Sequence, residues 1–188
     1  MIKLWHGSAT SNIGTFRPGV HLGSEIQALM IIVASEVLDG RTGTPTLYSC
    51  DLHAEPEEIC TLPDWRTPYI QGALYAYMQL HGETERFSRQ FLSELNKLGR
   101  SESEALSLRW LVEEMTPRGH VALKYPNRVE YKPDESYSVI DVGRLKLVHQ
   151  TCPIEAEIRD KLLNVAKSDT GYDEAEWGKI LKRLGRTI

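Results

Sequence analysis

The chain has 188 residues, a hydrophobic content of 41% and a formal net charge of −4. This length suits one domain, and the composition is typical of a globular protein. The longest apolar stretch, residues 28–34, is far shorter than the ~20 residues of a membrane-spanning helix. The N-terminus also lacks the apolar segment of a secretory signal. We therefore expect a cytoplasmic protein without a membrane partner, and the acidic charge argues against non-specific binding to nucleic acid.

Cysteine and histidine spacing gives no sign of a metal site. The three cysteines, Cys50, Cys60 and Cys152, form no Cys-x-x-Cys pair, and an odd count is typical of a reduced protein. We interpret them as small buried thiols. Four histidines follow no metal-binding spacing and are interpreted as structural: His53, His81, His120 and His149. Nucleotide-binding glycine loops and metalloprotease motifs are absent from the sequence as well.

The first part of the chain predicts a strand followed by a helix. Ile2–Trp5 is expected to be a strand that ends in a turn at Gly7-Ser8. Ser24 is expected to cap a helix, because Gln27 occupies the position that a capping box requires. This helix is expected to continue to about residue 38 and to end at Asp39-Gly40.

The remaining elements are predicted from hydrophobic periodicity. Residues 46–53 are expected to form a strand, and residues 56–68, with three prolines, are expected to be irregular. The later helices are expected at 69–80, 83–98, 102–115, 154–166 and 173–184, and the later strands at 120–125, 129–131 and 137–142. Strands and helices do not alternate strictly, so the predicted class is α+β rather than a doubly wound α/β fold.

His6 and Ser8 are the first candidate site residues. His6 stands where the first strand meets the expected turn, so its side chain can face a cleft while the Gly7 backbone stays open to a ligand. A neutral imidazole can donate a hydrogen bond to a ribose hydroxyl, and Ser8 can do the same. The alternative for His6 is a structural histidine whose hydrogen bonds are satisfied within the fold.

A second group of candidates precedes the expected helix. His21-Leu22-Gly23-Ser24 leads into the helix N-terminus, which offers free N–H groups and a positive dipole to a phosphate or a carboxamide. His21, Gly23 and Ser24 are therefore candidates for cofactor binding. Plain N-capping by Ser24 is the alternative.

Glu130 is the candidate catalytic carboxylate. On the expected strand 129–131, it could lie over a cleft and stabilise an oxocarbenium-like centre or activate a nucleophile. Alternatively, it is a surface glutamate paired with Arg128 or Lys132. Tyr137 can stack on a ring of a ligand or belong to the core.

The order of these motifs resembles that of the ADP-ribosyltransferase superfamily, and most closely its small bacterial and phage-borne members. The shared pattern is a His-Gly-Ser/Thr after the first strand, a His-x-Gly-Ser/Thr before the next helix, and a late Asn-x-x-Glu followed by a Ser-Tyr strand. In this chain the matching stretches are Leu4–Ser8, Val20–Ala28, Leu47–Leu52 and Asn127–Leu147.

The resemblance implies two small sheets around a cleft that holds NAD as the substrate, without a metal. It implies that His6 binds a ribose, that Gly7 holds the nicotinamide amide, and that Glu130 stabilises the transition state and orients the acceptor. The domain would span residues 1–153, with a helical block at 69–116 inserted, and residues 154–188 would be a helical extension of the same domain.

The resulting hypothesis is transfer of ADP-ribose from NAD to a macromolecule. The acidic charge favours a protein acceptor, while a nucleic-acid acceptor stays open. Phage-borne relatives include toxins and inhibitors of host or CRISPR defence proteins, so inactivation of such a factor is the expected context. Two alternatives remain. The family's middle Ser-Thr-Ser motif has no clear counterpart, so the chain could be an inactive binding module. A small ribonuclease could use His6 or His21 with Glu130 as acid and base.

Overall fold

The α+β class predicted from the sequence is confirmed by a computed structural model, which describes residues 1–9, 13–65, 69–95 and 97–186. Its strands are β1 (Ile2–Ser8), β2 (Val20–Leu22), β3 (Thr46–Leu52), β4 (Ile59–Thr61), β5 (Ala122–Pro126), β6 (Glu135–Val139) and β7 (Leu145–Thr151). Its helices are α1 (Glu25–Val37), α2 (Ile70–Leu80), α3 (Thr84–Arg86), α4 (Leu92–Leu95), α5 (Arg100–Met115), α6 (Glu155–Leu162) and α7 (Glu174–Arg183). None of the described helices is long and apolar enough to cross a bilayer.

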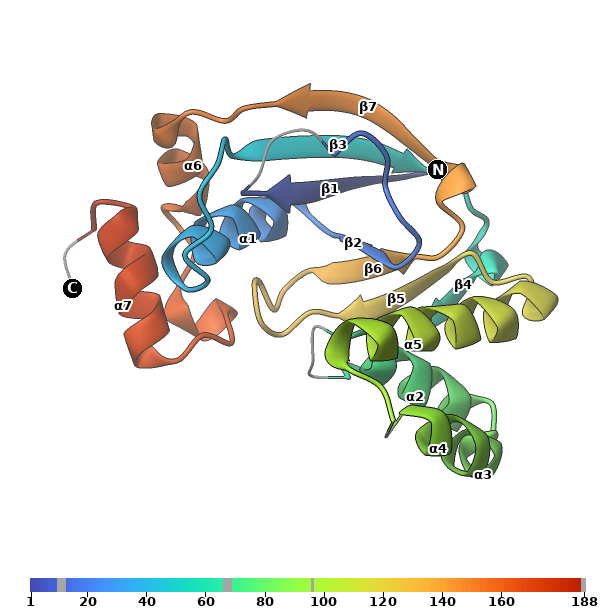
Figure 1. The fold of residues 1–188 in the computed structure, drawn as a ribbon. Coiled ribbons are helices and arrows are strands. Elements are labelled where there is room, and N and C mark those ends of the chain that lie inside the picture. The colour runs from blue at the N-terminus through green and yellow to red at the C-terminus, as the bar shows by residue number, and fades with distance from the viewer. Residues whose placement is uncertain (10–12, 66–68, 96, 187–188) are drawn as a thin grey trace.

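The strands form two separate sheets with a shared apolar core between them (Figure 1). One sheet has the antiparallel order β1-β3-β7; the other has the order β2-β6-β5-β4, in which β4 and β5 run parallel. The core between them buries Tyr48 and Leu52 of β3 against Ala122 and Val139 of the second sheet. Trp5 and Gly23 exchange two backbone hydrogen bonds, of 2.8 and 2.9 Å, and so connect the first sheet to the end of β2.

Helix α1 begins and ends where the local signals predict. The Ser24 hydroxyl accepts from the Gln27 N–H, and the Gln27 side chain accepts from the Ser24 N–H at 2.9 Å, which completes the capping box. Leu38 is the C-cap, and Gly40 follows with a left-handed φ of 65°. The buried face of α1 packs on β1 and on α6 and α7, so the C-terminal helices share one apolar cluster with α1.

The helical block expected at residues 69–116 covers the outer face of the second sheet (Figure 1). The prediction of one surface helix over residues 83–98 is wrong. In the described part of this segment, α3 and α4 flank a π-helical turn at Phe87–Phe91. The rings of Phe87 and Phe91 stack with centroids 4.7 Å apart and are buried under α5 and α2. Burial of these two rings outweighs the charged residues that suggested a surface helix.

Two predictions about strands in the N-terminal half of the chain are wrong. β1 does not turn at Gly7-Ser8 but continues through both residues, which pair with Leu47 and Thr46 of β3. β4 lies inside the segment 56–68 that was expected to be irregular, of which residues 66–68 lie outside the described residues. Both strands form because a partner strand distant in sequence satisfies their backbone groups.

Two further corrections concern the C-terminal half. Residues 129–131 are not a strand: they form a loop, because the Asn127 side chain accepts the Val129 and Glu130 N–H groups that a sheet would otherwise bind. Strand β7 was not predicted, because five of its seven residues are exposed and it lacks the alternation of a half-buried strand.

Candidate functional site

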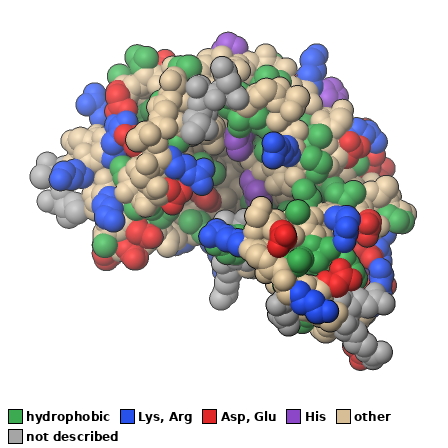
Figure 2. Space-filling view, in the orientation of Figure 1, with side chains coloured by type: hydrophobic (Ala, Val, Ile, Leu, Met, Phe, Trp, Pro, Cys, Tyr) green, Lys and Arg blue, Asp and Glu red, His purple; other side chains and the backbone are tan. Residues whose placement is uncertain are grey.

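A cleft of about 510 Å³ lies between the end of β1, one side of α1 along its length and the loop after β5. This volume falls within the range of small-molecule sites. Figure 2 shows a hollow in this face of the molecule, with histidine side chains at its inner end. His6 and Glu130 both line the cleft, although they are far apart in the sequence.

His6 and His21 form one wall of the cleft. The His6 Nδ1 lies 2.8 Å from the His21 carbonyl oxygen. Because a carbonyl only accepts, the proton of neutral His6 is on Nδ1, and Nε2 is left as an acceptor. Burial lowers the pKa of both imidazoles, that of His21 to about 4 with added repulsion from His6. At neutral pH, therefore, the free Nε2 of His6 can accept a hydrogen bond but cannot donate one, whereas the sequence interpretation had His6 as a donor.

Aromatic side chains support both histidines. The His6 ring makes an edge contact with Phe16, with centroids 5.7 Å apart. The His21 Nδ1 lies 2.7 Å from the Tyr125 hydroxyl, and the Tyr125 and Trp65 rings lie 4.0 Å apart beside it. Tyr125 and Trp65 line the cleft but were missed in the sequence, because neither lies in a recognisable motif.

Glu130 also lines the cleft, in the loop after β5. Asn127 Oδ1 accepts the N–H groups of Val129 and Glu130 at 3.0 and 3.3 Å, which fixes the loop backbone. Burial raises the pKa of the Glu130 carboxyl, and hydrogen bonds from its own backbone and from Asn127 oppose this rise in part. Among the described residues Glu130 forms no ion pair, and the Lys132 ammonium donates to the Ser168 carbonyl instead. The alternative of a surface ion pair is therefore not supported.

A chain of buried side chains connects the Glu130 loop to the start of α1. Asn127 Nδ2 donates to Ser136 Oγ at 2.9 Å, and Ser136 donates to Gln27 Oε1 at 3.2 Å. Gln27 Nε2 donates to the carbonyls of Tyr131 and Asp134. Gln27 is thus more than a capping residue, since it ties the start of α1 to the Glu130 loop. The Asn-x-x-Glu spacing was the sequence signal for Asn127. The capping box was the local signal for Gln27, but nothing in the sequence indicated its contacts with the Glu130 loop.

The segment before α7 supports the Glu130 loop from the other side. The Gly171 N–H donates to the Val129 carbonyl at 2.8 Å, and the Lys132 N–H donates to the Asp169 carbonyl at 2.6 Å. Tyr172 follows and lines the cleft. The C-terminal region, which matched no motif, therefore helps to position the candidate carboxylate.

The structure places the predicted site residues in two groups. His6, Gly7, His21, Gly23 and Glu130 line the cleft, whereas Ser8, Ser24 and Tyr137 do not. Tyr137 follows Ser136, which faces the cleft, so strand alternation directs Tyr137 to the opposite side, against the core between the sheets. The hydroxyl of Ser24 serves the capping box, as its alternative interpretation proposed.

Gly7 has a packing role that the sequence did not show. A Cβ at Gly7 would lie 1.9 Å from the Ala28 carbonyl oxygen, so glycine allows β1 to approach α1. Backbone groups two residues apart on a strand point the same way. Since Trp5 directs its N–H and C=O to Gly23, those of Gly7 point to the same side, where the cleft opens.

No protein-family model matches this chain, and comparisons with curated proteins and with solved structures find no match. Inference about the cleft therefore depends on its own residues.

Proposed function

We propose that this protein transfers ADP-ribose from NAD to a macromolecular acceptor, with a protein as the preferred acceptor. One observation carries the proposal: a partly buried carboxylate, Glu130, lines the same cleft as the neutral imidazoles of His6 and His21. The motif order that resembles the ADP-ribosyltransferase superfamily agrees with this arrangement.

The chemistry of the reaction suits a carboxylate at this position. When the bond between nicotinamide and ribose breaks, nicotinamide leaves with the bonding electrons and positive charge develops on the sugar. A fixed negative charge in a water-poor cleft stabilises such a centre more strongly than it would in water. The acceptor nucleophile then forms a bond to the same carbon, and Glu130 can take the proton that the nucleophile loses.

The other cleft residues suit the binding of the substrate. Nicotinamide presents a carboxamide with one donor group and one acceptor, which matches the C=O and N–H of Gly7 on the cleft side of β1. The Nε2 of His6 can accept from a ribose hydroxyl. Trp65 and Tyr125 offer ring faces for stacking.

Labelled NAD tests this proposal. Incubated with a bacterial lysate, the wild-type chain should transfer label to a discrete protein band, whose identity would show whether the acceptor is a host or defence factor. Glu130→Gln removes a charge with almost no change in volume and should reduce transfer by about 100-fold or more while keeping the fold. Glu113→Gln, at an exposed position on α5, is the matched control and should transfer normally.

Thermal unfolding with NAD separates the remaining alternatives. An inactive binding module would show a higher Tm with NAD but no labelled product. A ribonuclease would cleave RNA and show no shift with NAD; because burial lowers the pKa of both imidazoles and raises that of Glu130, its acid would have to be Glu130. If millimolar NAD gives neither a Tm shift nor labelled product, the proposal is wrong.

A further inference from the structure

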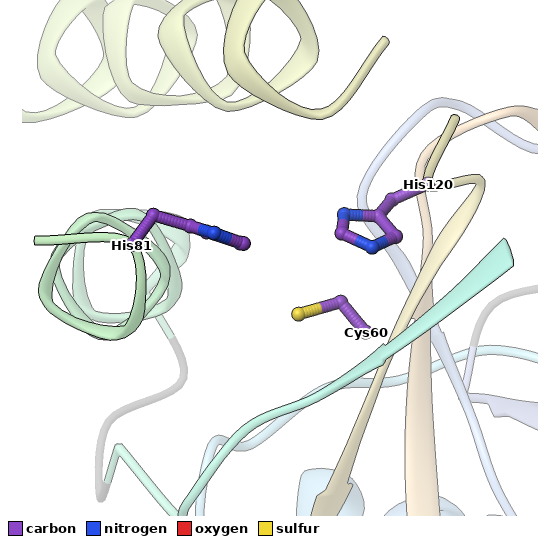
Figure 3. A group of neighbouring side chains, drawn as sticks. All are labelled: Cys60, His81 and His120. Carbon is purple, nitrogen blue, oxygen red and sulfur yellow. The ribbon is translucent and has the colours of Figure 1, made fainter. Parts of the chain in front are cut away.

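Three side chains that are distant in sequence meet at the base of the helical block. Cys60 lies on β4, His81 is the C-cap of α2, and His120 precedes β5. Figure 3 shows them directed toward one another. One ligand atom of each residue lies within 4.8 Å of the other two. None of the three lines the cleft, so this cluster is separate from the proposed NAD site.

The polar atoms of the cluster are only partly satisfied. His81 Nε2 is buried and has no hydrogen-bond partner among the described residues. A buried ring nitrogen without a partner is uncommon and calls for an explanation such as an ion. Cys60 is almost fully buried, so its sulfur lies inside the protein, and both histidines are half-buried.

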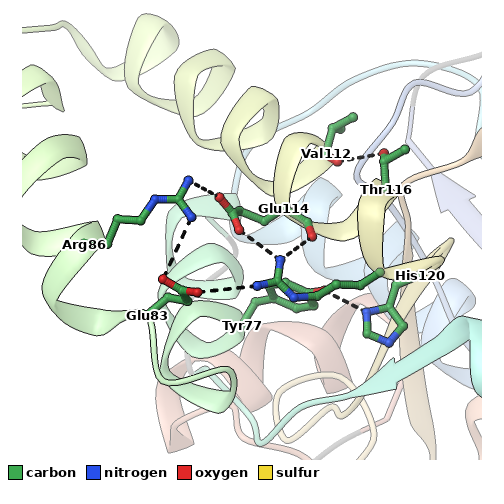
Figure 4. A network of polar contacts seen from close by, with 8 residues as sticks. Tyr77, Glu83, Arg86, Val112, Glu114, Thr116 and His120 are labelled. Carbon is green, nitrogen blue, oxygen red and sulfur yellow. Dashed lines mark hydrogen bonds and ion pairs between the residues drawn. The ribbon is translucent and has the colours of Figure 1, made fainter.

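A hydrogen bond to Tyr77 orients His120. The Tyr77 hydroxyl lies 2.7 Å from His120 Nδ1, which leaves Nε2 for another partner. Histidines that bind metal usually engage their second nitrogen in this way. Figure 4 shows that Tyr77 itself lies beside a network in which Arg86 bridges Glu83 and Glu114 near the end of α5.

Arg118 completes this network and further restrains Tyr77. Its guanidinium lies 5.9 Å from the centre of the Tyr77 ring and donates to both the carbonyl and the carboxylate of Glu114, at 2.7 and 3.0 Å. Tyr77, which orients His120, therefore packs against an arginine that ion pairs hold in place.

We propose that Cys60, His81 and His120 bind one zinc ion, with a solvent molecule as the fourth ligand. One sulfur and two imidazole nitrogens favour zinc over magnesium or calcium, which prefer oxygen ligands. Metal–ligand bonds of about 2.0–2.3 Å place tetrahedral ligand atoms roughly 3.3–3.8 Å apart. The present spacing thus requires only a small inward rotation of the side chains.

The ionisation of the three groups is compatible with this assignment. Burial lowers the pKa of His81 and His120, which keeps both imidazoles neutral, as metal ligands must be. Burial raises the pKa of Cys60, so zinc would displace the thiol proton as it binds.

Zinc at this position would join the end of α2 to the β4–β5 edge of the second sheet. The helical block would then be attached to the sheet by coordination bonds as well as by the apolar cluster that includes Tyr77 and Leu123. The inference is independent of NAD, because the three residues lie outside the cleft.

Cobalt substitution tests the site directly. The full chain, purified without a polyhistidine tag and treated with a chelator, should bind one Co²⁺ and show a thiolate-to-cobalt charge-transfer band with strong visible bands of tetrahedral cobalt. Zinc should abolish both signals by displacement. Cys60→Ser should remove the charge-transfer band, and His81→Gln should weaken cobalt binding by about 100-fold or more.

The matched controls replace a cysteine or a histidine that lies outside the cluster. Cys152→Ser removes an exposed thiol and His149→Ala an exposed histidine on β7, and both variants should bind cobalt as the wild type does. Tyr77→Phe keeps all three ligands and should reduce affinity about 10- to 100-fold. Absence of the band, or its loss in Cys152→Ser but not in Cys60→Ser, would overturn the proposal.

Thermal unfolding gives a second test, which does not require the Cys60→Ser variant to fold. Zinc at ~100 times its dissociation constant should raise the Tm of the wild type by roughly 5–10 °C. His81→Gln, at a half-buried position, should fold and show no such rise. An equal rise in wild type and His81→Gln would place zinc elsewhere and refute the site.

Discussion

At the scale of single residues, Gly7 is a position where packing should not tolerate a side chain. In Gly7→Ala, the new Cβ would lie 1.9 Å from the backbone carbonyl oxygen of Ala28 in α1. Neither β1 nor α1 can move alone to relieve this contact. We expect Gly7→Ala to reduce the free energy of unfolding by about 3 kcal/mol or more. Gly14→Ala, where a Cβ meets no atom within 4 Å, is the control. Urea denaturation measures both, and equal stabilities would refute the tight contact.

His6 is the second residue whose role one variant can decide. If its Nε2 accepts from a ribose hydroxyl, His6→Ala should raise the dissociation constant of NAD about 2- to 15-fold, which is the effect of one neutral hydrogen bond. The exposed His53 provides a control, since His53→Ala should leave NAD affinity unchanged. Titration calorimetry gives the affinity and thermal unfolding the stability. A destabilised His6→Ala protein that binds NAD normally would show that the ring only packs against Phe16 and Tyr48.

At the scale of elements, the C-terminal segment acts on the Glu130 loop through Gly171. A Cβ at Gly171 would lie 2.3 Å from the Arg128 carbonyl oxygen, so Gly171→Ala must displace one segment from the other. A displacement of about 1 Å at a catalytic group can reduce a rate 100-fold. We therefore expect kcat for ADP-ribose transfer to fall about 10- to 100-fold. Gly14→Ala should keep wild-type kcat, and an unchanged kcat in Gly171→Ala would show that the segment does not position Glu130.

At the scale of the whole molecule, His21 should make stability depend on pH. Its pKa falls from 6.5 to about 4 on folding, because burial and the nearby His6 disfavour the charged ring. Between these values the unfolded chain binds more protons, so the free energy of unfolding rises with pH. The contribution of His21 is fully present above pH 6.5 and is lost as the pH falls toward 4. It amounts to about 1–3 kcal/mol after allowance for solvent screening.

Urea denaturation at pH 7.5 and pH 4.5 checks this expectation. His21→Gln cannot titrate and should lose less stability than the wild type between the two pH values. A residual dependence should persist in the variant, because burial also lowers the pKa of His6. If the wild type and His21→Gln lose the same free energy of unfolding between these pH values, the His21 ring is solvated at low pH while the protein stays folded.

By itself, the sequence was sufficient for features encoded over a few residues. The capping box of Ser24 and Gln27, the limits of α1 and the position of β3 were predicted correctly, because helix caps and strand alternation are local properties. The spacing of Asn127 and Glu130 also drew attention to the segment that bears the candidate carboxylate, although that segment was predicted as a strand and is a loop.

Only the tertiary structure decided the features that arise between distant segments. It extended β1 through Gly7 by pairing with β3, turned Tyr137 away from the cleft, and showed that Gly171 supports the Glu130 loop. It also brought His81 and His120 to Cys60, although no spacing along the chain suggests a metal ligand. The physical reason is that backbone pairing, close packing and ligand convergence depend on contacts between residues far apart in sequence, which local periodicity and motif spacing do not encode.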